Sequence, residues 1–126
     1  MISTKKTVLV VDDEKDLRDA IATALTYEGF EVVTAADGEE AVLRAEESKP
    51  DLILLDILMP KKDGIAALTD IRKRTWGKNT PVIIMTVLDD MTKIAEALEA
   101  GANEYLVKTN IALGAVVQKV KKHLGV

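Results

Sequence analysis

Two hydrophobic patterns alternate along the chain. Short segments are apolar at nearly every position, which is typical of strands buried on both faces. Between them, apolar residues recur every three or four positions, which is typical of helices with one buried face. The first pattern predicts strands at Thr7–Val11, Phe30–Ala35, Asp51–Asp56, Pro81–Thr86 and Glu104–Val107. The second predicts helices at about Asp16–Tyr27, Gly38–Ser48, Gly64–Arg74, Met91–Ala100 and Asn110–Leu124.

Residues that favour helix ends support these limits. Asp37 and Asp63 can cap the second and third helices, and Gly29 and Gly101 are placed to end the first and fourth. Within the helices, the apolar residues at helical spacing are expected to face the core. These residues are Leu17, Ile21, Ala24, Leu25, Ala41, Val42, Ala45, Ile65, Leu68, Ile71, Ile94, Ala97, Leu98, Leu113, Val116, Val117, Val120 and Leu124.

Strand and helix alternate five times, and the connections between them are short. Right-handed crossovers then give a parallel sheet with helices on both faces. At this length the expected fold is α/β, a flavodoxin-like doubly wound sheet of five parallel strands in the order 2-1-3-4-5 with five helices. Such sheets bind ligands at the carboxyl ends of the strands where the strand order reverses, which here lies between the first and third strands.

Length and composition narrow the class of protein. The 126 residues suit a single domain with one core, so one domain is expected over residues 1–126. Cysteine is absent, which excludes disulfides, a thiol nucleophile and cysteine-bound metals. No signal-peptide pattern or membrane-length apolar run is present, and we expect a cytoplasmic protein without membrane contact. The net charge of −4 argues against direct binding of nucleic acid, which usually requires a basic face.

Acidic residues follow two of the strands that meet at the switch point. Asp12 and Asp13 come directly after the first strand, and Asp56 ends the third. We expect the three carboxylates to converge, and two such charges about 4 Å apart repel by roughly 1–4 kcal/mol unless a cation or a proton intervenes. Oxygen ligands without histidine or cysteine favour a hard cation, of which Mg²⁺ is the best candidate. The backbone carbonyl of Leu58 is a further candidate ligand.

The fourth and fifth strands end near Thr86 and Lys108, which add a hydroxyl donor and a positive charge to the same crevice. A carboxylate, a divalent cation, a hydroxyl and an ammonium group together suit a phosphoryl group, because the last three neutralise its oxygens. Asp56 is then the expected acceptor, since carboxylates can accept phosphoryl groups as aspartyl phosphates.

Four sequence motifs now identify a family. Over nearly its full length the chain resembles a response-regulator receiver domain of two-component signalling. Each motif is weak alone, but all four in this order are highly specific. They are VVDDE (Val10–Glu14), LLDILMPKKDG (Leu55–Gly64), IIMT (Ile83–Thr86) and GANEYLVK (Gly101–Lys108).

The resemblance implies roles for the acidic residues. Asp56 would be the phosphoacceptor, and Asp12, Asp13, Asp56 and the Leu58 carbonyl would surround Mg²⁺. A histidine kinase or a histidine phosphotransfer protein would supply the phosphoryl group. The protein would not be an enzyme with a separate substrate, but it would catalyse its own phosphorylation and slow dephosphorylation.

The resemblance also implies a switch. Thr86 would bind a phosphoryl oxygen, Lys108 would pair with the phosphoryl charge, and Tyr105 would turn inward when Thr86 moves. This movement would remodel the surface formed by the fourth helix, the fifth strand and the fifth helix, which is also a possible dimer surface. A downstream protein or an attached output domain would recognise the change. The sequence leaves open whether the receiver stands alone or belongs to a longer regulator.

The chain departs from the family pattern at two positions. Thr109 follows Lys108 where family members usually have proline after a commonly cis bond. A cis bond before proline costs only about 0.5–1 kcal/mol, but before threonine it costs roughly 2.5–4 kcal/mol, so we predict a trans bond. Val87 stands where the family favours a very small residue, and we predict that it slows phosphoryl exchange at Asp56.

Three other functions use similar residues. A phosphatase of the haloacid-dehalogenase type needs a second aspartate two positions after the nucleophile, where this chain has Leu58, which cannot transfer a proton. A flavodoxin-like FMN binder needs a phosphate-binding loop after the first strand, where Asp12, Asp13 and Glu14 would repel phosphate. A degenerate receiver that only docks a partner remains the third alternative.

Some conspicuous residues have ordinary structural interpretations. Trp76 is expected to shield the edge of the core, and His123 to be an exposed helix residue. Lys119, Lys121 and Lys122 favour the carboxyl end of the last helix electrostatically.

Overall fold

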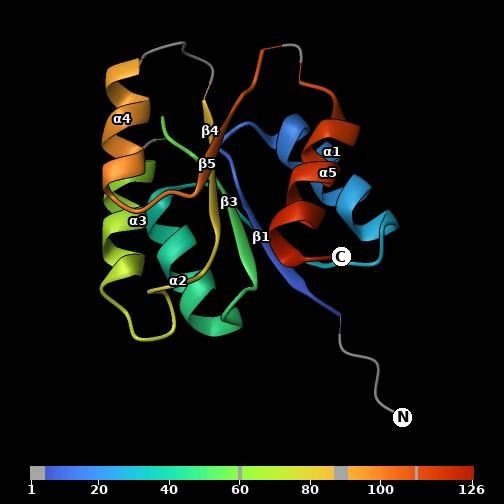
Figure 1. Cartoon of the computed structure of the whole chain (residues 1–126), viewed down its shortest axis with the longest axis horizontal. Helices are drawn as coiled ribbons and strands as arrows, with labels where there is room; N and C mark the ends of the chain where they lie inside the picture. The colour runs from blue at the N-terminus through green and yellow to red at the C-terminus, as the bar shows by residue number, and fades with distance from the viewer. Residues whose placement is uncertain (1–4, 60, 87–90, 110) are drawn as a thin grey trace.

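The sheet has the predicted parallel topology (Figure 1). The computed structural model describes residues 5–59, 61–86, 91–109 and 111–126. Within this part of the chain the strand order is β2-β1-β3-β4-β5, as predicted. The strands are β1 (Thr7–Val11), β2 (Glu31–Ala35), β3 (Leu52–Asp56), β4 (Val82–Thr86) and β5 (Glu104–Val107).

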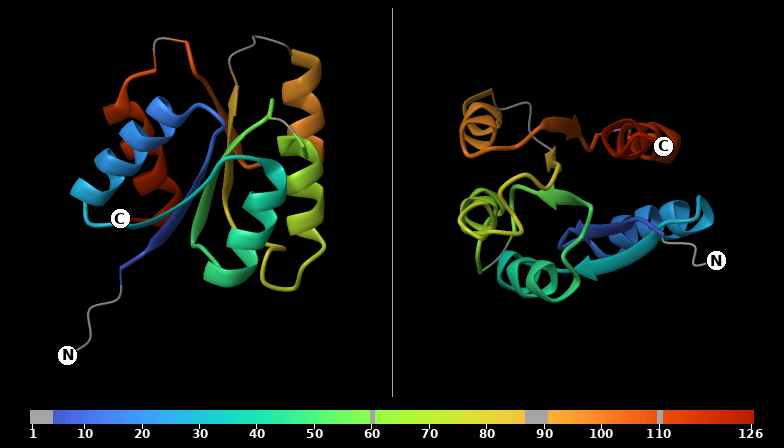
Figure 2. Two further views of the ribbon diagram at one scale, coloured as in Figure 1. Left: turned by 180° about the vertical axis from the view of Figure 1, so that it is seen from behind. Right: turned by 60° about the horizontal axis from the view of Figure 1, so that its bottom comes forward.

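Helices cover both faces of this sheet, which gives three layers (Figures 1 and 2). One face carries α1 and α5, and the other carries α2, α3 and α4. The helices are α1 (Lys15–Tyr27), α2 (Gly38–Ser48), α3 (Gly64–Arg72), α4 (Met91–Glu99) and α5 (Leu113–Leu124). The predicted fold class is therefore confirmed.

Two apolar clusters fill the spaces between these layers. Successive strand residues point to opposite faces, so Leu54 contributes to the cluster under α1 and α5 while Leu55 contributes to the cluster under α2 and α3. Every residue of β3 and β4 is buried, whereas β5 buries only Leu106. The buried central strands explain why β3 and β4 are apolar almost without interruption.

The helix ends follow the predicted capping residues. The Asp37 carboxylate accepts a hydrogen bond from the Glu40 amide at 2.9 Å, and Asp63 accepts from the Ala66 amide at 2.8 Å. Gly29 follows the end of α1 with a φ of 97°, a left-handed conformation that favours glycine.

Most predicted element limits agree with the structure within two residues, and α5 is the exception. This helix begins at Leu113, because the Ile111 amide donates to the Lys108 carbonyl in a turn and Ala112 is extended. The predicted start, Asn110, lies outside the described residues.

Two helix residues expected in the core are exposed. Leu98 is 43% exposed, because the nine-residue helix α4 buries a narrow stripe of Ile94 and Ala97 along the sheet edge. Leu113 is 37% exposed, because it lies in the first turn of α5, while the buried residues begin at Val116. Both predictions were wrong in the same way: helical spacing fixes a face but not how far the layer beneath it extends.

His123 and Trp76 differ in how well their predictions hold. His123 is half-buried rather than exposed, and its Nε2 lies 2.5 Å from Glu104 Oε2 on the edge strand. Trp76 packs against the edge of the core as predicted, and its Nε1 donates to Glu46 at 2.9 Å. Lys121, near the carboxyl end of α5, pairs with Glu28 at 2.6 Å.

Candidate functional site

Strand register brings the candidate residues to one edge of the sheet. Val11 pairs with Leu55 across β1 and β3, so Asp12 and Asp56 follow them at neighbouring positions. Thr86 pairs with Val107 across β4 and β5, which places Lys108 next along the edge. The sequence prediction that these strand ends meet is thus supported by the pairing of the strands.

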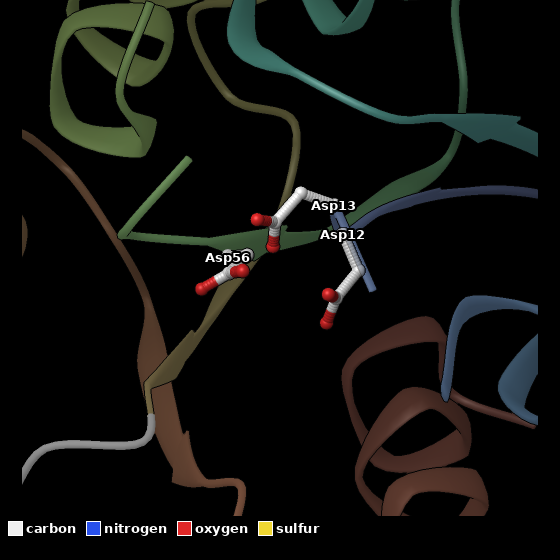
Figure 3. Close-up of side chains that lie close together, drawn as sticks. All are labelled: Asp12, Asp13 and Asp56. Carbon is white, nitrogen blue, oxygen red and sulfur yellow. The ribbon is translucent and has the colours of Figure 1, made fainter. Parts of the chain in front are cut away.

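The three predicted aspartates form one cluster (Figure 3). One carboxylate oxygen from each of Asp12, Asp13 and Asp56 lies within 4.8 Å of the other two. Asp12 is fully buried and Asp56 is 3% exposed, whereas Asp13 is exposed. Asp13 therefore borders the opening through which a ligand would reach the buried pair.

Backbone groups and one arginine hold Asp12. Its Oδ1 accepts a hydrogen bond from the Glu14 amide at 2.8 Å, which ties the carboxylate to the start of α1. Its carbonyl accepts from Arg18 Nη1 at 2.8 Å, and its amide donates to the Ala35 carbonyl at 3.1 Å. The Glu14 amide thus orients the carboxylate, while Arg18 of α1 and Ala35 of β2 hold the backbone.

Asp56 is held by the loop that follows it. The Leu58 amide donates to Asp56 Oδ1 at 3.3 Å, and the Gly64 amide donates to the Ile57 carbonyl at 2.8 Å. A Cβ on Gly64 would lie 2.1 Å from the Asp56 carbonyl oxygen, so only glycine allows α3 to begin this close to the strand end. The Asp63-Gly64 pair thus shapes the loop as well as the helix cap.

Lys108 reaches both buried carboxylates. Its Nζ lies 2.8 Å from Asp12 Oδ2 and 3.1 Å from Asp56 Oδ2, and its side chain is 6% exposed. Burial lowers the pKa of Lys108, but the hydrogen bonds and charges of Asp12 and Asp56 outweigh burial and leave this pKa above its usual value. Lys108 is therefore charged and neutralises part of the cluster.

Asp56 is harder to ionise than an ordinary aspartate. Burial raises its pKa most, the Lys108 charge lowers it, and the Asp12 charge raises it again, which leaves the pKa at about 6. A carboxylate held in this way gains from any further positive charge that reaches it.

The cluster fits a divalent cation. Asp12 Oδ2 is fully buried, and among the described residues its partner is the Lys108 ammonium, which it shares with Asp56. Three carboxylates face one ammonium group, which leaves excess negative charge, and all the donors are oxygens. This donor set suits Mg²⁺, as predicted from the sequence.

Thr86 and Tyr105 lie on the neighbouring strands. Thr86 is buried at the end of β4, beside the cluster along the sheet edge. Tyr105 is 38% exposed on β5 and pairs with Ile84. The Tyr105 side chain is therefore partly open to solvent.

The two departures from the family pattern have different outcomes. The described residues contain no cis peptide bond, so the predicted trans bond between Lys108 and Thr109 is confirmed. Lys108 nevertheless points into the cluster, so the trans bond does not misdirect it. Val87 lies outside the described residues, and its effect on exchange stays a prediction.

Sequence reasoning missed Arg18, the side chain that binds the Asp12 carbonyl. Arg18 lies four residues after Glu14, whose carbonyl accepts the Arg18 amide hydrogen bond in the first turn of α1. This helical spacing turns the arginine back towards the end of β1. In the sequence, the position of Arg18 in the first turn of the helix, six residues after Asp12, could have indicated this contact.

Comparison with known proteins decides the family. The model of the response regulator receiver domain matches residues 8–121. The chain belongs to the response regulator receiver family. The resemblance predicted from the four motifs is therefore confirmed, and the phosphatase and FMN-binding alternatives lose their basis.

Curated relatives are longer than this receiver. The probable transcriptional regulator ycf27 of Guillardia theta is 43% identical over 107 residues, which cover 85% of this chain and 41% of that protein. The transcriptional regulatory protein PrrA of Mycobacterium tuberculosis is 41% identical over 118 residues, covering 94% of this chain and 49% of PrrA. The matched part of the receiver thus spans less than half the length of each of these two relatives.

Solved structures agree with the fold over nearly the whole chain. Chemotaxis protein CheY4 of Vibrio cholerae has a TM-score of 0.89 and 31% identity, covering 95% of this chain and 99% of that one. The receiver domain of sensor histidine kinase PA1611 of Pseudomonas aeruginosa has a TM-score of 0.88 and 29% identity, and the match covers 98% of this chain and 100% of that one. That structure is described with a magnesium ion coordinated in the active-site cleft. In the described part of this receiver, no helix combines the length and apolar character needed to span a membrane.

Proposed function

We propose that this receiver is a phosphorylation-dependent switch of a two-component system and that Asp56 accepts the phosphoryl group. The observation that carries the proposal is the position of Lys108, whose ammonium group contacts the two buried members, Asp12 and Asp56, of a three-carboxylate cluster. An attacking carboxylate, a cation site and a positively charged side chain beside them suit phosphoryl transfer, because the positive groups can neutralise the phosphoryl oxygens.

In the proposed reaction, an Asp56 carboxylate oxygen attacks the phosphorus of a phosphohistidine. The new O–P bond forms as the N–P bond breaks, and the histidine nitrogen keeps the electron pair of that bond. Asp12, Asp13, Asp56 and the Leu58 carbonyl would hold Mg²⁺, which when bound would neutralise charge on the phosphoryl oxygens. Lys108 exchanges its contact with Asp56 Oδ2 for a phosphoryl oxygen, which keeps its charge paired.

Thr86 and Tyr105 carry the proposed signal away from Asp56. The phosphoryl group adds about two negative charges to the crevice, which changes the relative stability of two arrangements of the nearby surface. We propose that the Thr86 hydroxyl moves to bind a phosphoryl oxygen and that the Tyr105 ring follows it inward. The surface of α4, β5 and α5 would then change for partner binding, including possible dimerisation.

The proposed partners follow from the family. A histidine kinase or a histidine phosphotransfer protein supplies the phosphoryl group in the cytoplasm. A downstream protein or an output domain attached to residues 1–126 responds to the switch, and relatives of twice this length that are named transcriptional regulators support the second possibility. The receiver domain itself contacts neither nucleic acid nor membrane in this proposal.

Incubation with acetyl phosphate and Mg²⁺, followed by intact-protein mass spectrometry, tests the proposal. We expect an adduct of about 80 Da that requires Mg²⁺ and is absent from Asp56→Asn. Asp63→Asn is the matched control, because this exposed aspartate caps α3 in the same loop and should leave the adduct unchanged. No adduct on the wild type would favour the degenerate receiver that only docks a partner.

A further inference from the structure

A backbone contact joins the start of α2 to the loop that carries Leu58. A Cβ on Gly38 would lie 1.9 Å from the Lys62 carbonyl oxygen and 2.8 Å from the Lys62 Cβ. Gly38 is buried, and its φ lies outside the left-handed region. Close approach to Lys62, rather than an unusual backbone conformation, therefore requires glycine at this position.

Both sides of this contact are braced. On the α2 side, Asp37 accepts from the Glu40 amide at 2.9 Å, and the Glu40 carboxylate accepts from the Ala36 amide at 2.6 Å, so Glu40 bonds both residues that precede the helix. On the loop side, Lys62 Nζ donates to Asp70 Oδ2 of α3 at 2.7 Å. The start of α2 is therefore held by its own capping bonds, and Lys62 is held by α3.

The same loop is also anchored where it leaves and rejoins the regular structure. Close packing of Gly64 on the Asp56 carbonyl fixes the end of the loop, and the Leu58 amide is tied to Asp56 Oδ1 at its start. Between these two anchors, Lys62 packs against Gly38, which adds a third restraint on the loop.

We propose that Gly38 is a positioning residue for the cation site: by letting α2 close against Lys62, it holds the Leu58 carbonyl towards the three carboxylates. This inference rests on the proposed function, because it assumes that Leu58 is a cation ligand. Mg²⁺ requires near-ideal octahedral geometry at about 2.0–2.1 Å, whereas Ca²⁺ tolerates flexible geometry at about 2.3–2.6 Å. A displaced loop should therefore weaken Mg²⁺ binding more than Ca²⁺ binding.

Calorimetric titration of the whole chain with Mg²⁺ and with Ca²⁺ tests this selectivity. For Gly38→Ala we expect the Mg²⁺ Kd to rise about tenfold, as for other residues that orient metal ligands, and the Ca²⁺ Kd to rise by less than about threefold. The matched control is Gly114→Ala on α5, because its Cβ would meet nothing within 4 Å, and both Kd values should stay at wild-type levels. Equal changes for the two cations, or no change, would overturn the positioning role.

The outcomes separate this inference from the function on which it rests. A wild type that binds no Mg²⁺ contradicts the proposed function itself, whereas a wild type that binds Mg²⁺ with an unaffected Gly38→Ala contradicts only the role of Gly38. If Gly38→Ala does not fold, NMR of the wild type provides the test. The Gly38 amide resonance should then shift during Mg²⁺ titration with the midpoint seen for Asp56, while that of Gly114 stays in place. A stationary Gly38 resonance would overturn the inference.

Discussion

The Lys108 ammonium group lies 3.1 Å from Asp56 Oδ2, although 52 residues separate the two in the chain. The same ammonium is 2.8 Å from Asp12 Oδ2, so one cation is shared by two buried carboxylates. Lys108 therefore occupies the place where positive charge is most needed in the metal-free protein, and it would compete with a metal ion for the same oxygens.

Removing this ammonium should destabilise the metal-free protein and strengthen Mg²⁺ binding. Lys108→Ala leaves two buried carboxylates without their partner, so we expect the free energy of unfolding in EDTA to fall by about 3 kcal/mol. Mg²⁺ should restore much of the loss and should bind the variant more tightly than it binds the wild type. Urea unfolding with and without Mg²⁺ measures both effects. Arg44→Ala is the control, because its exposed pairs with Glu40 and Glu47 should contribute less than about 1 kcal/mol.

Weaker Mg²⁺ binding by Lys108→Ala would contradict competition between the ammonium and the metal ion.

Ionisation of Asp56 should destabilise the metal-free protein as the pH rises. Burial is the main reason that the pKa of Asp56 rises from 3.8 to about 6, with Lys108 lowering it and Asp12 raising it. The folded state thus holds the proton more tightly than the unfolded chain, and stability is lost between about pH 4 and pH 6. In EDTA, the free energy of unfolding of Asp56→Asn should exceed that of the wild type by about 1–3 kcal/mol at pH 7. The two values should approach each other near pH 4.

Thermal unfolding in EDTA across this pH range measures the difference. Asp63→Asn should follow the wild-type profile, since asparagine caps a helix as well as aspartate does. A pH-independent difference for Asp56→Asn would mean that the Asp56 charge is not the cause.

Glu104 should stabilise the joint between β5 and α5 at neutral pH. Hydrogen bonds from Lys119, and then from His123, hold the pKa of Glu104 below its usual value of 4.5. A lowered carboxyl pKa stabilises the fold above the unfolded value and loses this effect as the pH falls through the folded value. Glu104→Gln should therefore lower the free energy of unfolding by about 1 kcal/mol at pH 7 and by less at pH 3, as measured by urea unfolding. The exposed Glu96→Gln serves as control, and an equal loss at both pH values would show that charge is not involved.

Replacing Arg72 by lysine should destabilise the fold. Its guanidinium donates to the Gly77 and Thr80 carbonyls at 2.7 Å each and to the Gly101 carbonyl, which joins α3 to the segments before β4 and β5. An ammonium group cannot satisfy acceptors in these separate directions, so Arg72→Lys should lower the free energy of unfolding by about 2 kcal/mol. Chemical unfolding compares it with Arg44→Lys on α2, whose exposed ion pairs should make the same change nearly neutral. Equal losses in the two variants would refute the proposed role of Arg72.

The strand pattern predicted the fold well because β3 and β4 are buried on both faces and therefore apolar throughout. The convergence of Asp12, Asp13 and Asp56 also followed from sequence, because parallel strands end at one edge and the strand order fixes which ends are neighbours. The roles of these residues came from the resemblance and from chemistry, and experiments must test them.

The sequence could not predict the features that depend on how separate helices and strands pack against each other. Helical spacing placed Leu98 on an apolar face, but only the width of the sheet edge decides that Ala97 is covered and Leu98 is not. His123 has a polar neighbour, Glu104, from an element 19 residues away. Gly38 looks like an ordinary first helix residue until the Lys62 backbone is seen against it.

The central claim is that Asp56, and no neighbouring carboxylate, carries the phosphoryl group. Borohydride reduction of the protein after treatment with acetyl phosphate and Mg²⁺, followed by peptide mass spectrometry, tests this directly, because reduction converts an aspartyl phosphate to homoserine. The account predicts homoserine at position 56 only when Mg²⁺ is present. Homoserine at Asp12 or Asp13, or at no position in a protein that binds Mg²⁺, would contradict it.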